Sequence, residues 1–175
     1  MNNNYDLILL TSKYFNELYN WQIAETHFDY YTCRPVNLAN SYNEYTNKLK
    51  KSMQCKKTYI LINQDIFNIP LGKISLFNYN PRNHSAEFGY YMPEPNRNKG
   101  LGSIMLKLFI AKAFKDTTLN LNKLYATTSS NNLASINLLK KFNFRLDGQM
   151  REHYWIGENK YNQLIFSILK KEAKL

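Results

Sequence analysis

The chain has 175 residues, and a domain of this length buries about two thirds of its unfolded surface, which favours one folded domain with a sizeable core. With 44% hydrophobic and 15% aromatic residues, the composition argues against a disordered or low-complexity protein. The formal charge of +10 favours anionic partners, but the lysines are scattered rather than gathered in a tract, which argues against a nucleic-acid-binding protein.

Targeting and metal-binding signals are missing from the sequence. The first residues lack the basic start and apolar core of a signal peptide, and no stretch has the ~20 apolar residues of a membrane span, so we expect a cytoplasmic protein without a membrane partner. Cys33 and Cys55 are isolated and predict reduced thiols. His27, His84 and His153 lie far apart and lack ligand spacing, so we expect no metal.

The hydrophobic pattern predicts a strand, two helices, three strands, a helix, a strand, a helix and two strands. The predicted strands are 5–10, 58–63, 71–78, 84–92, 123–128, 144–156 and 160–169, and the predicted helices are 12–23, 42–53, 101–114 and 133–142. This order predicts an α/β (α+β) fold, with a mixed, mostly antiparallel sheet of about seven strands flanked by about four helices.

Several local signals place the helix starts and their buried faces. Thr11 or Ser12 can cap the first helix, and Ser41 and Glu44 have the spacing of a capping box before the second. The segment 26–40 is irregular and predicts part of a pocket wall. The third helix carries an apolar stripe that we expect to face the sheet: Leu101, Ile104, Met105, Leu108, Ala111 and Phe114.

The pattern Arg97-x-x-Gly100-x-Gly102 leads from a strand directly into this third helix. Glycine permits positive φ and a close approach of backbone amides, and the first turn of a helix adds unpaired N–H groups, so the loop predicts an anion site. The alternative is a glycine-rich connection without a ligand. The loop lacks the Gly-Lys-Ser/Thr ending of a nucleoside triphosphate site.

Four motifs in order carry a resemblance to a known family. They are Ala86-Glu-Phe-Gly-Tyr90, the Arg97–Gly102 pattern, Asn132-x-Ala-Ser135, and the strand pair after Phe144. With these motifs the chain resembles the GCN5-related N-acetyltransferase (GNAT) superfamily, within it the RimJ/RimL-like ribosomal-protein N-terminal acetyltransferases, and near them the spermidine acetyltransferases. The resemblance implies a single acetyltransferase domain over residues 1–175, with its sheet split near the cofactor site.

The resemblance also implies acetyl-CoA as co-substrate. Its pyrophosphate would be bound by the amides of Arg97, Asn98, Lys99, Gly100, Leu101, Gly102 and Ser103. Its pantetheine arm would pair with the backbone of Tyr90, Tyr91 and Met92, as if it were an added strand, which requires a bulge or splay after Gly89. Asn132 would also reach this arm. The alternative is that Asn132 only caps the following helix, and the two roles are compatible.

Two residues are candidates for catalysis by the same resemblance. Glu87 would deprotonate the amine, and the alternative is a salt-bridge partner on a half-buried strand. Leu139 stands where many relatives place the tyrosine that protonates the leaving thiolate. Ser135 matches a serine that the RimJ/RimL-like group has near the sulfur, so the resemblance makes it our candidate for this acid. Its alternative role is ordinary first-turn helix chemistry.

Two further departures from the family concern Asn143, in place of a glycine, and Asn162, in place of an aspartate. Asparagine tolerates the left-handed conformation, so we expect the helix to end normally at Asn143. The acceptor pocket is predicted from the N-terminal half and the late strand: Glu25, His27, Phe28, Tyr30, Tyr31, Glu152, His153, Tyr154 and Trp155.

The sequence thus predicts an N-acetyltransferase in which a primary amine attacks the bound thioester directly. The acceptor would be a protein N-terminus or a small amine, and alternatives are a polyamine such as spermidine or an amino sugar. A non-catalytic acetyl-CoA-binding module and an RNA-binding protein are the readings of another class. The resemblance also allows a homodimer that joins through the long C-terminal strands.

Overall fold

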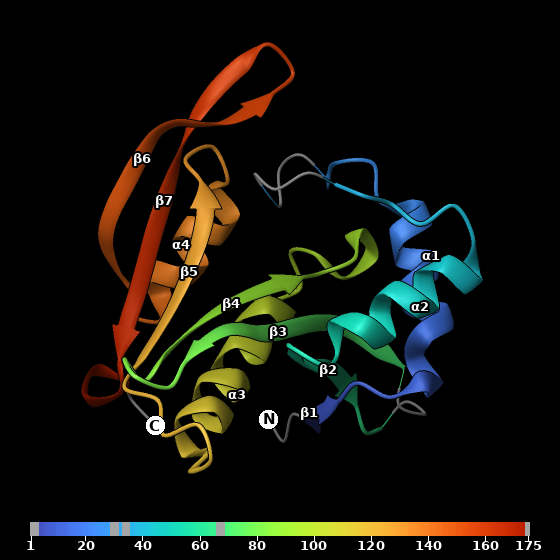
Figure 1. The fold of residues 1–175 in the computed structure, drawn as a ribbon, viewed down its shortest axis with the longest axis horizontal. Helices are drawn as coiled ribbons and strands as arrows, with labels where there is room; N and C mark the ends of the chain where they lie inside the picture. The colour runs from blue at the N-terminus through green and yellow to red at the C-terminus, as the bar shows by residue number, and fades with distance from the viewer. Residues whose placement is uncertain (1–3, 29–31, 33–35, 66–68, 174–175) are drawn as a thin grey trace. The chain divides into compact units, whose positions relative to one another are not determined.

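Strands and helices follow one another along the chain in the predicted order in the computed structural model, which describes residues 4–28, 32, 36–65 and 69–173. The strands are β1 (Tyr5–Leu9), β2 (Lys57–Asn63), β3 (Pro70–Asn80), β4 (Ser85–Tyr91), β5 (Lys123–Ser129), β6 (Arg145–Ile156) and β7 (Asn159–Leu169). The helices are α1 (Phe15–Ala24), α2 (Tyr42–Ser52), α3 (Leu101–Lys115) and α4 (Leu133–Lys141) (Figure 1). Short 3-10 turns cover Ser12–Tyr14, Glu94–Asn96 and Lys170–Glu172.

The strands form a 7-stranded sheet in the order β1-β2-β3-β4-β5-β7-β6. Of the strand pairs with known register, β4 and β5 are parallel, and β1–β2, β2–β3, β5–β7 and β6–β7 are antiparallel. The prediction of a mixed, mostly antiparallel sheet with flanking helices is therefore confirmed. Across the described part of the chain, every helix is too short or too polar for a bilayer span.

The chain divides into two compact units. The first contains Met1–Thr26, Asn37–Asn78 and Tyr90–Phe109, and the second contains His27–Val36, Tyr79–Gly89 and Ile110–Leu175.

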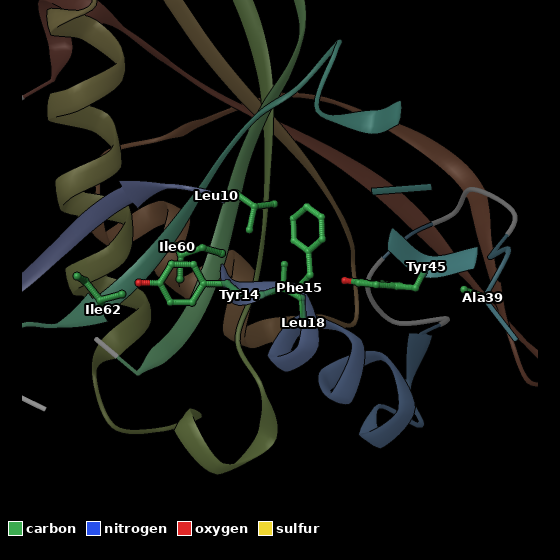
Figure 2. Packing of buried hydrophobic residues seen from close by; sticks show 8 residues of the cluster. All are labelled: Leu10, Tyr14, Phe15, Leu18, Ala39, Tyr45, Ile60 and Ile62. Carbon is green, nitrogen blue, oxygen red and sulfur yellow. The ribbon is translucent and has the colours of Figure 1, made fainter. Parts of the chain in front are cut away.

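In the first unit, α1 and α2 build a hydrophobic core with strands β1 and β2. Figure 2 shows its buried side chains, which are Leu10, Tyr14, Phe15, Leu18, Ala39, Tyr45, Ile60 and Ile62. Burial of a large apolar side chain contributes about 1.5–3 kcal/mol, so this cluster is a main source of stability for the unit. Tyr59 of β2 does not belong to this cluster and contacts Phe109 of α3, with ring centroids 6.2 Å apart.

In the second unit, β7 pairs with β5 on one edge and with β6 on the other. β6 and β7 form a long hairpin, and α4 lies beside β5 (Figure 1). The register of β6 shifts between Leu146 and Gly148 and again between Met150 and Tyr154. Phe88 of β4 packs on Phe144, with ring centroids 5.4 Å apart, which joins the strand before the candidate site to the end of α4.

The predicted helix signals were confirmed in part. The hydroxyl of Ser41 accepts from the amide of Glu44 at 3.2 Å, but the Glu44 carboxylate accepts from the amide of Asn40 rather than from that of Ser41. No side-chain cap forms at Thr11, because a 3-10 turn precedes α1 and holds the amide of Tyr14 on the Thr11 carbonyl. Asn143 has φ 62, so the left-handed end of α4 is confirmed.

The buried face of α3 differs from the predicted stripe. Leu101, Met105 and Phe114 are buried as expected, whereas Ile104, Leu108 and Ala111 are only half-buried. The remaining buried residues of the helix are Leu106, Phe109, Ile110 and Ala113. Buried positions therefore span a wider arc than a single stripe, and the prediction was wrong on which positions lie deepest.

Candidate active site

The Arg97–Gly102 pattern forms a loop whose backbone conformation alternates in handedness. Strand β4 ends at Tyr91, a 3-10 turn covers Glu94–Asn96, and α3 begins at Leu101. Asn98 and Gly100 adopt positive φ, 59° and 76° respectively. A Cβ atom at Gly100 would meet no atom within 4 Å, so glycine is required there for its conformation rather than for space.

Within this loop, several consecutive backbone N–H groups form no hydrogen bond to a backbone carbonyl in the described part of the chain. The Arg97 amide donates to the Glu94 carbonyl at 3.0 Å, and the Ser103 amide donates to the Gly100 carbonyl at 3.0 Å. Between them, the amides from Asn98 to Gly102 have no acceptor among the residues that the structure describes. Successive amides in such an alternating turn form an anion-binding concavity at the helix start, which we call the amide cradle.

The side chains before the amide cradle fix the loop to its own unit. Asn96 donates through Nδ2 to the Leu71 carbonyl at 2.8 Å. Arg97 donates through Nε to the Met92 carbonyl at 2.9 Å and through Nη2 to Glu25 Oε2 at 2.5 Å. The Arg97 side chain thus binds carbonyl and carboxylate groups of the protein, while the amides of the cradle and the start of α3 offer partial positive charge to an anion.

Glu25 also accepts from the hydroxyl of Tyr91, at 2.9 Å. The rings of Trp21 and Tyr91 lie 6.0 Å apart, and the Lys73 ammonium lies 5.6 Å from the Tyr91 ring centroid. Burial, reinforced by the charge of Lys56, lowers the pKa of Lys73 to about 8. Polar groups therefore surround Tyr91, one of the residues predicted to bind the pantetheine arm through its backbone.

In the second unit, the parallel pairing of β4 and β5 is short. It joins Ser85–Glu87 to Lys123–Tyr125, and β5 then continues to Ser129 paired only with β7. The ladder thus ends at Glu87, before the position after Gly89 where we expected a bulge or splay. Backbone groups beyond the end of a ladder need other partners, which is the property that an added strand would use.

Glu87 lies where this ladder ends. It is 6% exposed, and the Thr127 hydroxyl of β5 donates to its Oε1 at 3.3 Å. A buried carboxylate needs hydrogen-bond donors, and Thr127 supplies one. None of the sequence motifs pointed to Thr127, because only the pairing of β4 with β5 brings the two residues together.

Asn132 and Ser135 meet at the start of α4. Asn132 Oδ1 accepts from the Ser135 amide at 3.1 Å, so the predicted N-cap is confirmed. The structure leaves the proposed contact of Asn132 with the pantetheine arm as a prediction. Leu139 has no exposed surface and belongs to the core, so it offers no proton donor.

The residues predicted for the acceptor pocket lie in different environments. Glu25 is buried in the first unit, where it binds Arg97 and Tyr91. Among the residues of the late strand, Tyr154 is buried, whereas Glu152, His153 and Trp155 are exposed. His27 is exposed and Phe28 half-buried. Tyr30 and Tyr31, like Cys33, lie outside the described residues.

Asn162 has a structural role at the β6–β7 hairpin. Its side-chain Oδ1 accepts from the backbone amide of Glu152 at 3.0 Å, and its backbone amide donates to the Ser130 hydroxyl at 3.1 Å. The replacement of the family's aspartate therefore leaves a residue that joins β7 to β6 and to the end of β5.

Curated proteins similar to this chain are N-acetyltransferases of bacilli. The uncharacterized N-acetyltransferase p20 of Bacillus licheniformis is 32% identical over 51% of this chain and 49% of that protein. The putative ribosomal N-acetyltransferase YdaF of Bacillus subtilis is 27% identical over 58% of this chain and 54% of that protein. YnaD of the same species is 26% identical over 73% of this chain and 72% of that protein. The chain thus spans about half the length of p20 and YdaF.

Solved structures resemble the whole chain. The spermidine N-acetyltransferase of Vibrio cholerae, solved with CoA and spermine, has a TM-score of 0.84 at 18% identity and covers 98% of both chains. The same enzyme in a dodecameric intermediate state gives 0.80 at 18% identity, covering 98% of this chain and 96% of that one. At this identity the likeness shows the fold. The acetyltransferase (GNAT) domain family itself matches residues 6–145, so the chain belongs to that family, as the sequence motifs predict.

Proposed function

We propose that residues 1–175 form a single acetyl-CoA-dependent N-acetyltransferase domain that acts in the cytoplasm on a primary amine. The observation that supports this most is the amide cradle, because its amides from Asn98 to Gly102 have no acceptor in the described part of the chain and adjoin the start of α3. Membership of the GNAT family supports the pyrophosphate of acetyl-CoA as the anion that this cradle would bind.

The residues present fit such a co-substrate. The amide cradle would bind the pyrophosphate, and the backbone of Tyr90, Tyr91 and Met92 would bind the pantetheine arm. Strand β4 reaches Tyr91, while its ladder with β5 ends at Glu87. Bound acetyl-CoA supplies the acetyl thioester that the amine attacks.

The chain's own residues would then move two protons. Glu87 would accept a proton from the acceptor ammonium, directly or through water, because an ammonium has no lone pair with which to attack. Ser135 would donate its hydroxyl proton to the sulfur as the thiolate leaves, and the second proton that the amine nitrogen loses as the amide forms would restore the hydroxyl. Asn132 would hold the start of α4 and so fix the backbone from which Ser135 extends.

For the acceptor we propose a protein N-terminus or a small neutral amine, as in the RimJ/RimL-like branch. The name of YdaF, a putative ribosomal N-acetyltransferase, supports this choice. The alternative is a polyamine, which the likeness to spermidine N-acetyltransferase supports. A polycation is disfavoured by the net charge of +10, and Glu25, a carboxylate predicted for the pocket, already binds Arg97.

A thiol-release assay with acetyl-CoA tests the proposal against a panel of N-terminal peptides, free amino acids, polyamines and amino sugars. We expect steady release with at least one N-terminal peptide or small amine, and release that falls with Glu87→Gln. Calorimetry with CoA separates the alternatives: binding without release for any amine would support a non-catalytic module, and no binding near millimolar CoA would overturn the proposal.

We also propose that the protein forms a homodimer through its C-terminal strands. β6 is the last strand in the sheet order, so its outer edge offers backbone groups to a second chain. Light scattering after size-exclusion chromatography would give the mass directly, and a monomer at all concentrations would contradict this proposal.

A further inference from the structure

The proposed reaction assigns no step to the carboxylate of Glu25, which is a buried charged group near the amide cradle. Glu25 caps the C-terminal end of α1, and its amide donates to the Trp21 carbonyl at 3.1 Å. Its side chain is 3% exposed and accepts from Arg97 and from the Tyr91 hydroxyl. A carboxylate this deeply buried is costly unless it is paired, and here a cation and a hydroxyl compensate it.

Arg97 transmits this anchoring to the amide cradle. Its Nε binds the Met92 carbonyl while its Nη2 binds Glu25, so the guanidinium ties together the two ends of the 92–97 segment. Its central carbon lies 6.0 Å from the Tyr91 ring centroid, where the aromatic face also favours a cation. Arg97 directly precedes Asn98, the first amide of the cradle.

The positive charge of Arg97 serves to hold the loop in place through Glu25 rather than to attract an anionic ligand directly. The negative end of the α1 dipole and the Glu25 carboxylate both attract the Arg97 guanidinium. Because Arg97 is paired with Glu25, its main contribution to the affinity for an anion would be the orientation that it gives to the amides from Asn98 to Gly102. A loop ordered in advance loses less entropy when a ligand binds.

We propose that Glu25 is a positioning residue for the pyrophosphate of acetyl-CoA, and that it acts by fixing Arg97 and, through it, the amide cradle. This inference rests on the proposed function. Glu25 itself would touch neither the co-substrate nor the amine. Its effect should therefore depend on whether the donor carries a pyrophosphate.

Two acetyl donors test this dependence. Acetyl-CoA carries the pyrophosphate, whereas acetyl-pantetheine ends before it and needs only the strand and the catalytic residues. With Glu25→Ala we expect the KM for acetyl-CoA to rise about tenfold, because the amide cradle would then have to be ordered when the pyrophosphate binds. The KM for acetyl-pantetheine should stay within about twofold of wild type, because this donor has no pyrophosphate for the amide cradle to bind.

Two further variants guard the result. Glu25→Gln keeps an oxygen that can accept from Tyr91 and Arg97 and should restore part of the affinity, and it decides the test if Glu25→Ala does not fold. Arg97→Ala should raise the KM for acetyl-CoA at least as much as Glu25→Ala, and the double variant should lose no more than Arg97→Ala alone, because Glu25 acts through Arg97.

The matched control is Glu44→Ala, which removes another paired carboxylate of the same unit. Glu44 binds Lys48 at 2.6 Å on the exposed face of α2, and its loss should leave both donors unaffected. Equal increases in KM for both donors with the Glu25 variants, or no increase for either, would overturn the inference. If wild type binds no CoA in calorimetry, the proposed function itself fails, which is a different result.

Discussion

The amide cradle and the end of the β4–β5 ladder are built in different ways. The cradle offers backbone groups, oriented by positive φ at Asn98 and Gly100 and anchored by the side chains of Asn96 and Arg97. The ladder end offers single side chains, Glu87 above all, placed by strand pairing. The first should respond to changes in backbone conformation and the second to changes in chemistry. Binding and turnover are therefore expected to be separable by mutation.

Replacement of the Glu87 carboxylate tests the chemical half of this comparison. Glu87→Gln keeps the shape and an oxygen that accepts from Thr127, but it cannot take a proton. We expect kcat to fall at least about 100-fold, with the KM for acetyl-CoA unchanged, as for a lost general base. Steady-state kinetics at saturating amine measures both. If Glu87→Gln weakened acetyl-CoA binding as much as it lowered kcat, binding and turnover would not be separable in this way.

Backbone strain at Gly100 tests the other half. Gly100→Val forces a β-branched residue to φ 76, which costs about 1–2 kcal/mol or displaces the loop, so we expect CoA affinity to fall about tenfold. Calorimetry with CoA measures this fall.

Gly157→Val is the matched control for Gly100→Val. Gly157 has φ 59 and, like Gly100, no atom within 4 Å of a built Cβ. Both variants should lose similar thermal stability, but Gly157→Val should keep its affinity for CoA. Equal affinities in the two variants would show that the cradle does not bind CoA.

Ser135→Ala sharpens the chemical half further. If the hydroxyl protonates the leaving thiolate, kcat should fall about tenfold and most of the loss should disappear with a donor whose thiol is more acidic. The amide of Ser135, which binds Asn132, is unaffected by the change, so α4 should keep its stability in thermal unfolding. A wild-type kcat would return Ser135 to a purely structural role.

Lys73→Met gives the smallest expected effect and concerns stability only. Lys73 is half-buried beside Tyr91, and the structure shows no ion pair for it among the described residues. Removal of a cation in this position should stabilise the protein at pH 7 by about 1 kcal/mol. Chemical denaturation measures this difference.

The pH dependence of that difference follows from the lowered pKa of Lys73, about 8 against an ordinary value of 10.5. Between these values the unfolded chain binds more protons at this lysine than the folded one does, so wild-type stability rises with pH. The advantage of Lys73→Met should therefore be full below pH 8 and vanish toward pH 10.5. A difference that does not change with pH would contradict the lowered pKa.

Local features of the site could be predicted from the sequence, and long-range ones could not. The Asn132 cap, the left-handed Asn143 and the start of α3 each depend on a few neighbouring residues, so the sequence pattern contains them. The contact of Arg97 with Glu25 joins positions 72 residues apart, and that of Thr127 with Glu87 joins positions 40 apart. No periodicity or motif relates such positions.

The error on α3 has a related cause. Hydrophobic periodicity selects one stripe, which suits a helix that covers a sheet with a narrow face. In the structure Leu106, Phe109 and Ile110 are buried together with Leu101 and Met105, so a wide arc of the helix is covered. The width of a buried arc depends on the partners that surround the helix, which the helix's own sequence does not specify.

The amides from Asn98 to Gly102 also have a consequence for hydrogen exchange. An amide without an acceptor exchanges with solvent as soon as water reaches it, whereas the neighbouring amides of Arg97 and Ser103 are held on carbonyl groups. The stretch would thus exchange quickly in the free protein and slow sharply when an anion occupies it. Hydrogen-exchange mass spectrometry of the peptides that contain this loop would therefore measure how much of the protein has an anion bound, without an added label.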